Sequence, residues 1–147
     1  MLNRRNFLFW CAGLWAMAAG LARAQADPLA PLVRDITGGA PLTVGKVSID
    51  TPRLADNGHS VPLKVSVDNP MTEASHVRSI SLLSPRNPRP LIAKFTLGPR
   101  AGRAEVSTRV RLNGSQVVLA IAQLSDGTFW SGTAEVEVTE SACLDAG

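Results

Sequence analysis

The spacing of apolar residues changes along the chain and divides it into three parts. An almost unbroken apolar run extends from Phe7 to Leu21. A short stretch with apolar residues three and four positions apart follows it, as in an amphipathic helix: Leu29, Leu32, Val33 and Ile36. From Val44 onward apolar and polar residues mostly alternate, which is typical of half-buried strands. The pattern therefore predicts a leader segment, one short helix and a β domain.

The predicted helix has recognisable ends. Asp27-Pro28 should open it, because Asp is a good N-cap residue and Pro suits the first helical position. Gly38-Gly39 should end it, since glycine is common just after the last helical turn.

The strand pattern predicts about seven strands, with turns rather than helices between them. Turns are expected near Thr51-Pro52 and at Asp56-Asn57-Gly58, and hairpin turns at Asn113-Gly114 and Asp126-Gly127. The nearly continuous apolar run Val117–Leu124 is expected to be a central strand. Together these features predict an antiparallel β-sandwich. The expected strands are 44–49, 61–67, 77–84, 91–97, 104–112, 117–124 and 128–139.

The first 26 residues have the composition of an export signal. Arg4 and Arg5 precede the apolar run, no acidic residue occurs, and 22–26 offers overlapping A-x-A cleavage sites after Ala24 and Ala26. Adjacent arginines followed by Phe-Leu suggest the bacterial twin-arginine route. An uncleaved membrane anchor is the alternative, but the apolar run is short for a span of about 20 residues. We expect a signal peptide at 1–26, a β domain at 27–139 and a tail at 140–147, with no membrane association after cleavage.

Removing the leader changes what the charge implies. The leader holds three of the 15 Lys and Arg residues and none of the 12 Asp and Glu residues, so the rest of the chain is balanced. Nucleic-acid binding thereby loses its main support. A central group of cations remains, with two interpretations: a solvated strand face or a docking patch for an acidic partner. Its members are Lys94, Arg100, Arg103, Arg109 and Arg111.

Candidate catalytic and metal-binding residues are few. His59 and His76 are separate and unmatched by cysteines, so no metal site and no cofactor are expected. Ser60, His59 and Asp56 are neighbours in a turn and cannot supply triad geometry. Phe129 and Trp130 are expected to be core or sheet-edge aromatics. The sequence therefore predicts a protein that is not an autonomous enzyme.

Cys143 is the residue that points to a function. The only other cysteine, Cys11, lies in the expected signal, which would leave one thiol on a short C-terminal tail. Such a residue indicates intermolecular pairing or a reactive thiol. Three hypotheses follow: a carrier that presents Cys143 to other proteins, a structural β module with Cys143 in an intermolecular disulfide, and a small thiol enzyme.

Five segments in order, with their spacing, resemble the SoxY family of sulfur carriers across essentially the whole chain after the leader. The segments are Thr37-Gly38-Gly39, Asn57-Gly58-His59-Ser60-Val61-Pro62, Pro70-Met71-Thr72-Glu73-Ala74, Leu97-Gly98-Pro99-Arg100-Ala101-Gly102-Arg103-Ala104 and Ser125-Asp126-Gly127-Thr128-Phe129-Trp130-Ser131-Gly132.

This resemblance implies an all-β, immunoglobulin-like sandwich in the periplasm, paired with a SoxZ-like β-sandwich subunit as a heterodimer. It also implies that Cys143 holds thiosulfate-derived intermediates covalently and presents them to haem-containing and hydrolytic Sox enzymes. The tail departs from the family pattern, because Ser141-Ala142-Cys143-Leu144 stands where Gly-Gly-Cys-Gly-Gly is typical. Leu144 adds bulk, and the non-glycine flanks reduce the freedom of the arm.

Overall fold

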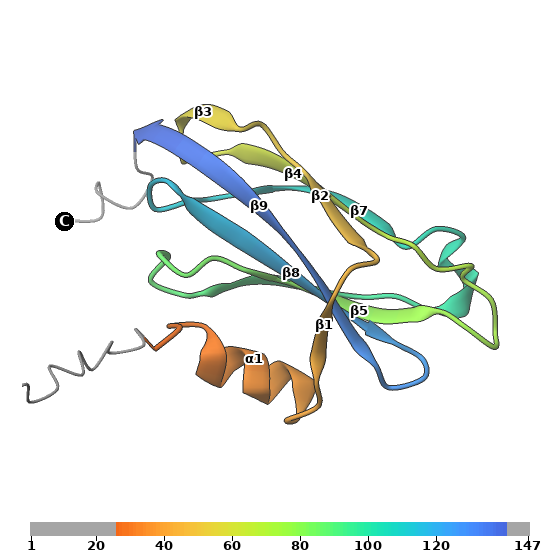
Figure 1. Ribbon diagram of the computed structural model, residues 1–147. Helices are drawn as coiled ribbons and strands as arrows, with labels where there is room; N and C mark the ends of the chain where they lie inside the picture. Colours follow the sequence, from red (N-terminus) through yellow and green to blue (C-terminus); the bar gives the residue numbers. More distant parts are fainter. Residues whose placement is uncertain (1–25, 141–147) are drawn as a thin grey trace, which may run out of the picture.

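Two β-sheets pack face to face, and one helix lies on the outer surface of the larger sheet (Figure 1). This computed structural model describes residues 26–140. The larger sheet has the strand order β1-β9-β8-β5-β6, with β3 also paired to β9, and the smaller sheet has the order β2-β4-β7. The predicted fold class, a β-sandwich with a short N-terminal helix, is confirmed.

The described residues contain one α-helix, one 3₁₀ turn and nine strands. Their bounds are α1 (Ala30–Thr37), β1 (Leu42–Val44), β2 (Val47–Asp50), β3 (Leu54–Asn57), β4 (Val61–Val67), β5 (Val77–Leu83), β6 (Leu91–Thr96), η1 (Pro99–Ala101), β7 (Glu105–Val110), β8 (Gln116–Leu124) and β9 (Phe129–Glu140).

The helix begins later than its sequence suggests. A carboxylate oxygen of Asp27 accepts a hydrogen bond from the Leu29 amide at 2.9 Å, which stabilises a turn before the helix rather than its first turn. The helix itself starts at Ala30 and ends as expected at Gly38, whose φ of 63° is the left-handed conformation that glycine adopts readily. Its apolar stripe packs on Leu83, Ile121 and Phe129, on the outer face of the larger sheet.

The expected single strand 44–49 is wrong, because the chain changes sheets within it. Gly45 and Lys46 both have positive φ, 134° and 58°, which breaks the extended backbone. Before the break β1 pairs in parallel with β9, and after it β2 pairs antiparallel with β4 in the other sheet.

One predicted hairpin is confirmed and the other is wrong. Asp126-Gly127 joins β8 to β9, which pair antiparallel with Gln123 opposite Phe129. Asn113-Gly114 instead carries the chain from one sheet to the other, since β7 pairs with β4 whereas β8 pairs with β5 and β9. The sandwich is also not purely antiparallel, because β1 and β3 both run parallel to β9.

The core lies between the sheets and is built by alternation. Val61, Leu63, Val65 and Val67 of β4 are buried, while the residues between them face outward. The prediction that β8 is central is confirmed, since it lies between β9 and β5. Its nearly continuous apolar run has a structural reason: one face meets the core and α1 packs on the other.

Candidate functional site at the carboxyl end of β9

The last described strand positions the start of the C-terminal tail. Cys143 itself lies outside the described residues, three positions after Glu140. β9 runs one residue further than expected, to Glu140, and β3 pairs with its final part, with Asn57 opposite Glu140. The next amide, that of Gly58, donates to the Glu140 carbonyl at 2.7 Å. Backbone hydrogen bonds therefore fix the point from which the tail departs.

Three polar loops, 58–60, 84–90 and 111–115, lie beside this point. The Gly58 carbonyl accepts a hydrogen bond from the Leu112 amide at 2.9 Å, which joins loop 58–60 to loop 111–115. The side-chain amide of Asn87 donates to the Arg111 carbonyl at 2.7 Å, and its oxygen accepts from the Asn113 amide at 2.8 Å. Loops 58–60, 84–90 and 111–115 are thus tied together at one end of the sandwich, the end where β9 finishes (Figure 1).

Four exposed arginines lie on these loops and on the adjoining end of β7, and we call them the tail-base arginines: Arg86, Arg89, Arg109 and Arg111. Arg86 donates from Nη1 to the Ser115 carbonyl at 2.7 Å, and Arg109 donates from Nη1 to the Ser60 hydroxyl at 3.3 Å.

The cation group expected from sequence is not one patch. Arg109 and Arg111 lie at the tail end, whereas Arg100 is in η1 and Arg103 follows it, at the opposite end of the sandwich (Figure 1). Lys94 lies on β6, in the other sheet from β7. Sequence order alone cannot separate these residues, because the sandwich distributes neighbouring segments between its two ends.

The two histidines lie in different places. The His59 amide donates to the Asn57 side chain at 3.1 Å near the tail base. The His76 ring lies 3.2 Å from the Thr72 carbonyl, in the loop before β5. Within residues 26–140, no group of three or more His, Cys, Asp or Glu residues could hold a metal ion. No helix in that range is long and apolar enough to cross a membrane.

The two expected aromatics pack in the core or against it, which confirms the first of the two predicted places. Phe129 is buried in the cluster beneath α1. Trp130 is half-buried against the inter-sheet core, and Lys46 Nζ lies 4.6 Å from its ring centroid. The Trp130 Nε1 donates to the Thr128 hydroxyl at 3.1 Å. That hydroxyl also donates to the Asp126 carboxylate. This hydrogen bond is the main reason that the pKa of Asp126 lies below the ordinary aspartate value.

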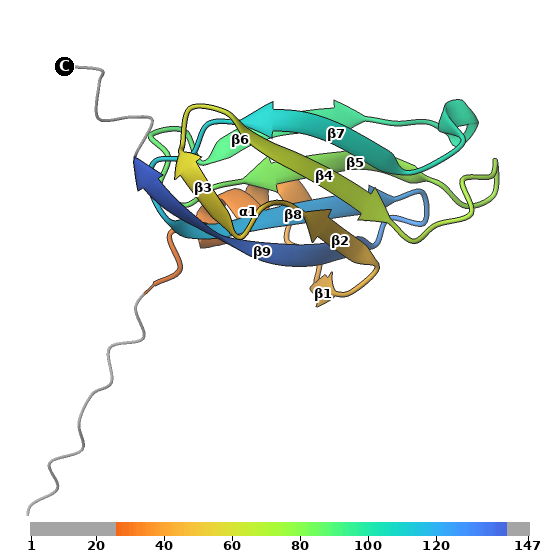
Figure 2. The same cartoon turned by 90° about the horizontal axis from the view of Figure 1, so that it is seen from above.

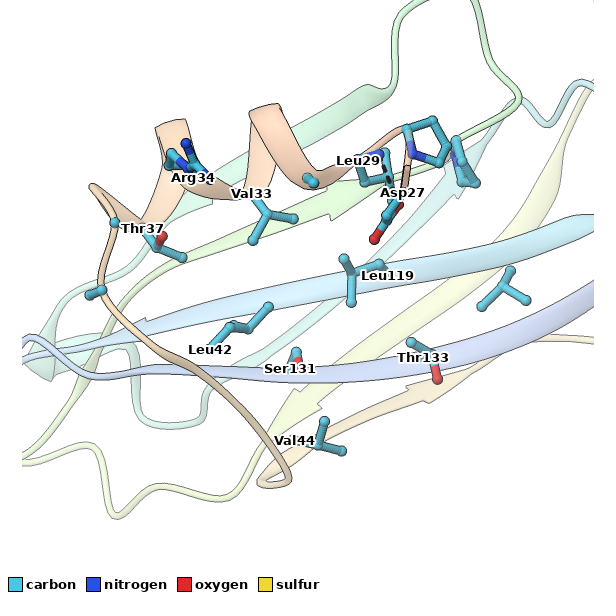
Figure 3. A pocket seen from close by; sticks show the side chains of 16 residues that line it. Asp27, Leu29, Val33, Arg34, Thr37, Leu42, Val44, Leu119, Ser131 and Thr133 are labelled. Carbon is cyan, nitrogen blue, oxygen red and sulfur yellow. Dashed lines mark hydrogen bonds between the residues drawn. The ribbon is translucent and has the colours of Figure 1, made fainter. Parts of the chain in front are cut away.

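An apolar groove of about 670 Å³ lies between α1 and the outer face of the larger sheet (Figure 3). Val33 of the helix and Leu119 of β8 face each other across it, and Ser131 and Thr133 of β9 form part of its floor. Val44, 85% exposed, also lines it. The sequence prediction missed this groove, because a helical stripe and a strand pattern do not show how completely one covers the other.

Comparison with known proteins identifies the chain. The profile of the family described as sulfur oxidation protein SoxY matches residues 33–143, and so ends at Cys143. The chain belongs to the SoxY family. This family consists of periplasmic sulfur carriers that act in sulfur oxidation, are not themselves catalysts and in general pair with SoxZ.

Solved structures agree with this assignment. The chain is similar to the sulfur carrier protein SoxY from Chlorobium limicola f thiosulfatophilum, with 29% identity and a TM-score of 0.66 over 78% of this chain and 98% of that one. The search of curated proteins finds no match.

Two superoxide reductases share the fold. The neelaredoxin from Ignicoccus hospitalis has 21% identity and a TM-score of 0.56 over 64% of this chain and 80% of that one. The enzyme from Nanoarchaeum equitans has 13% identity and a TM-score of 0.54 over 65% of this chain and all of that one. At this identity the likeness concerns the fold alone.

Proposed function

We propose that the protein is a periplasmic carrier that holds thiosulfate-derived sulfur covalently on Cys143 and presents it to Sox enzymes. The observation that carries the proposal is the family match, which extends through the tail to this cysteine. Cys143 is also one of only two cysteines, and the other falls in the expected signal at 1–26.

The chemistry starts with oxidative coupling. The Cys143 thiol and thiosulfate form a sulfur–sulfur bond, giving a cysteine S-thiosulfonate, one proton and two electrons, which a haem-containing Sox enzyme accepts. Water then cleaves the terminal sulfonate in a hydrolytic Sox enzyme. Sulfate and a proton leave, and Cys143 keeps a persulfide for further oxidation or transfer.

The geometry at the end of β9 supports presentation of Cys143 to a partner's active site. The tail departs from a point held by the bond between Gly58 and Glu140, so the domain can dock while the tail extends. The three steps from Glu140 to Cys143 span about 10 Å when extended. That reach suits a shallow active-site entrance.

Export and pairing complete the proposal. The signal at 1–26 should deliver the chain to the periplasm by the twin-arginine route, and N-terminal sequencing of periplasmic material should give Gln25 or Asp27 as the first residue. We expect a stable heterodimer with a SoxZ-like subunit. Exposed sheet edges need protection or pairing, and β6 and β7 are edge strands on the same side of the molecule (Figure 2).

The deciding experiment is intact-mass analysis of the protein incubated with thiosulfate and competent Sox enzymes. Mass increments of thiosulfate or added sulfur atoms should form, should be removed by a thiol reductant and should be absent from Cys143→Ser, which should still pair with its partner. An unmodified wild-type protein beside active partners would contradict the carrier function. A Cys143-dependent dimer band on a non-reducing gel would then favour the structural module.

A further inference from the structure

Charge is unevenly distributed around the base of the tail. The loop side carries the four tail-base arginines, and no Asp or Glu occurs in 58–60, 84–90 or 109–115. The β3–β9 side carries three exposed acidic residues, Asp56, Glu137 and Glu140. One cation, Arg53, also belongs to this side, and its backbone carbonyl accepts a hydrogen bond from the Glu137 amide. A negative group on the tail is therefore repelled from one side and attracted to the other.

The loop side lies within reach of Cys143. Glu140 bonds to Gly58, and Gly58 bonds in turn to Leu112, so two backbone steps separate the end of β9 from the segment that carries Arg111. Each such step is about 4.8 Å, the usual spacing of hydrogen-bonded strands, which gives about 10 Å in all. The extended tail covers about the same distance between Glu140 and Cys143.

The arginines are suited to bind an anion with several oxygens. A guanidinium carries five N–H donors, and the hydrogen bonds to Ser115 and Ser60 each occupy one donor of Arg86 and Arg109. Those two bonds also fix the positions of the side chains, so less conformational freedom is lost when they bind. Sulfonate oxygens accept hydrogen bonds from arginine in the same way as carboxylate and phosphate oxygens.

We propose that the tail-base arginines form an anion-binding surface that receives the negatively charged sulfur adduct of Cys143 between visits to partner enzymes. The ligand class is a terminal sulfonate on a sulfur chain, as in cysteine S-thiosulfonate. This assignment rests on the proposed function, since it takes Cys143 as the attachment site. It implies that the charge on the adduct decides whether the arm rests against its own domain or extends from it.

The test uses a matched pair of adducts and no Sox chemistry. Isotope-labelled protein purified from the periplasm is alkylated at Cys143 with iodoacetate, which adds a carboxylate, or with iodoacetamide, which adds a neutral amide of nearly equal size. Amide resonances of Ser60, Arg89 and Arg111 should shift more with the anionic adduct than with the neutral one. The difference should shrink at high salt. Amides of 98–103, at the opposite end of the sandwich, should not respond.

Charge-removing variants identify the surface. Arg109→Gln with Arg111→Gln should abolish the difference between the two adducts, whereas Arg100→Gln with Arg103→Gln, the same charge change at the other end, should leave it intact. Arg109→Gln with Arg111→Gln should also lower the rate of Cys143 alkylation by iodoacetate roughly two- to fivefold at low salt. Arg100→Gln with Arg103→Gln should lower that rate less.

Equal shifts from both adducts, or a difference that survives the first pair of substitutions, would overturn the inference. Neither result bears on thiosulfate loading of Cys143, which the mass experiment measures separately.

Discussion

Gly132 in β9 lies directly against the backbone of Val47 in β2, so that a Cβ at Gly132 would overlap the Val47 carbonyl oxygen. The contact joins the two sheets at the point where the chain has just crossed between them. Only glycine leaves room for this approach, because the obstructing atom belongs to the backbone and cannot rotate away.

Gly132→Ala should therefore destabilise the domain by about 1–3 kcal/mol, the usual cost of inserting a methyl group into a packed interior. Chemical denaturation measures the loss. Gly98→Ala is the matched control, since Gly98 has extended backbone and no atom within 4 Å of an added Cβ. The control should be neutral or slightly stabilising, and equal effects at both positions would show that the contact is not close in solution.

Ser81→Ala should leave stability unchanged or raise it by up to about 1 kcal/mol. The Ser81 side chain is 1% exposed, and its hydroxyl has no hydrogen-bond partner in the described part of the chain. Removing an unsatisfied buried hydroxyl also removes its desolvation cost.

Ser84→Ala provides the contrast. Its buried hydroxyl donates to the Gln116 side-chain oxygen, so its loss should cost about 1 kcal/mol. Thermal unfolding of the two variants side by side should separate them. A larger loss for Ser81→Ala than for Ser84→Ala would contradict this assignment of partners.

The Asp126 carboxyl should titrate below the ordinary aspartate pKa, because Thr128 donates to it from its hydroxyl and from its amide. A group whose pKa is depressed on folding stabilises the folded state at pH above its unfolded pKa. That contribution is lost as the pH falls through the folded pKa. Thr128→Val removes the hydroxyl bond and should move the pKa upward. Carboxyl carbon shifts followed by NMR below pH 5 give both titration curves, and identical midpoints would rule out the hydroxyl as the cause.

Leu144→Gly should preserve sulfur loading on Cys143 and accelerate it. A glycine removes the leucine side chain and narrows the arm, and this gain in access should outweigh the cost of about 0.5–1 kcal/mol that ordering a glycine adds. Initial rates of adduct formation by intact mass, with a Sox enzyme partner present, provide the measurement. Leu144→Ala removes bulk and keeps the backbone stiffer, so its initial rate of adduct formation should lie between those of the wild type and Leu144→Gly. A slower Leu144→Gly variant would indicate that the leucine contacts the partner productively.

Much of the fold could be predicted from the chain, because its strongest patterns reflect local constraints. Alternation in 61–67 and the Asp126-Gly127 turn depend on neighbouring residues, and both are found as expected. The interruption at Gly45-Lys46 and the crossing at Asn113-Gly114 were misjudged, because a turn sequence specifies a bend and leaves the partner strand open. β3 was missed because Asp56-Asn57 resembles a turn and its pairing with β9 spans some eighty residues of sequence.

The candidate site was accessible from sequence only in part. Cys143 stands out by its position near the end of the chain. Arg86 and Arg111 do not, since 25 positions separate them, and it is the hydrogen bonds of Asn87 to Arg111 and Asn113 that bring their loops together. Considered along the chain, the tail has only acidic neighbours, whereas in the fold the end of β9 is hydrogen-bonded through Gly58 to the segment that carries Arg111.

The pairing of β9 also has a mechanical consequence. Under the proposed function, a partner enzyme that holds the tail while the domain moves away would pull on β9 along its length. The hydrogen bonds to β8 run across that direction, as ladder bonds do in an antiparallel pair, and β1 and β3 hold the other edge of the strand at its two ends. Tension along β9 would therefore be shared among many bonds in shear, instead of opening them one after another from the tip.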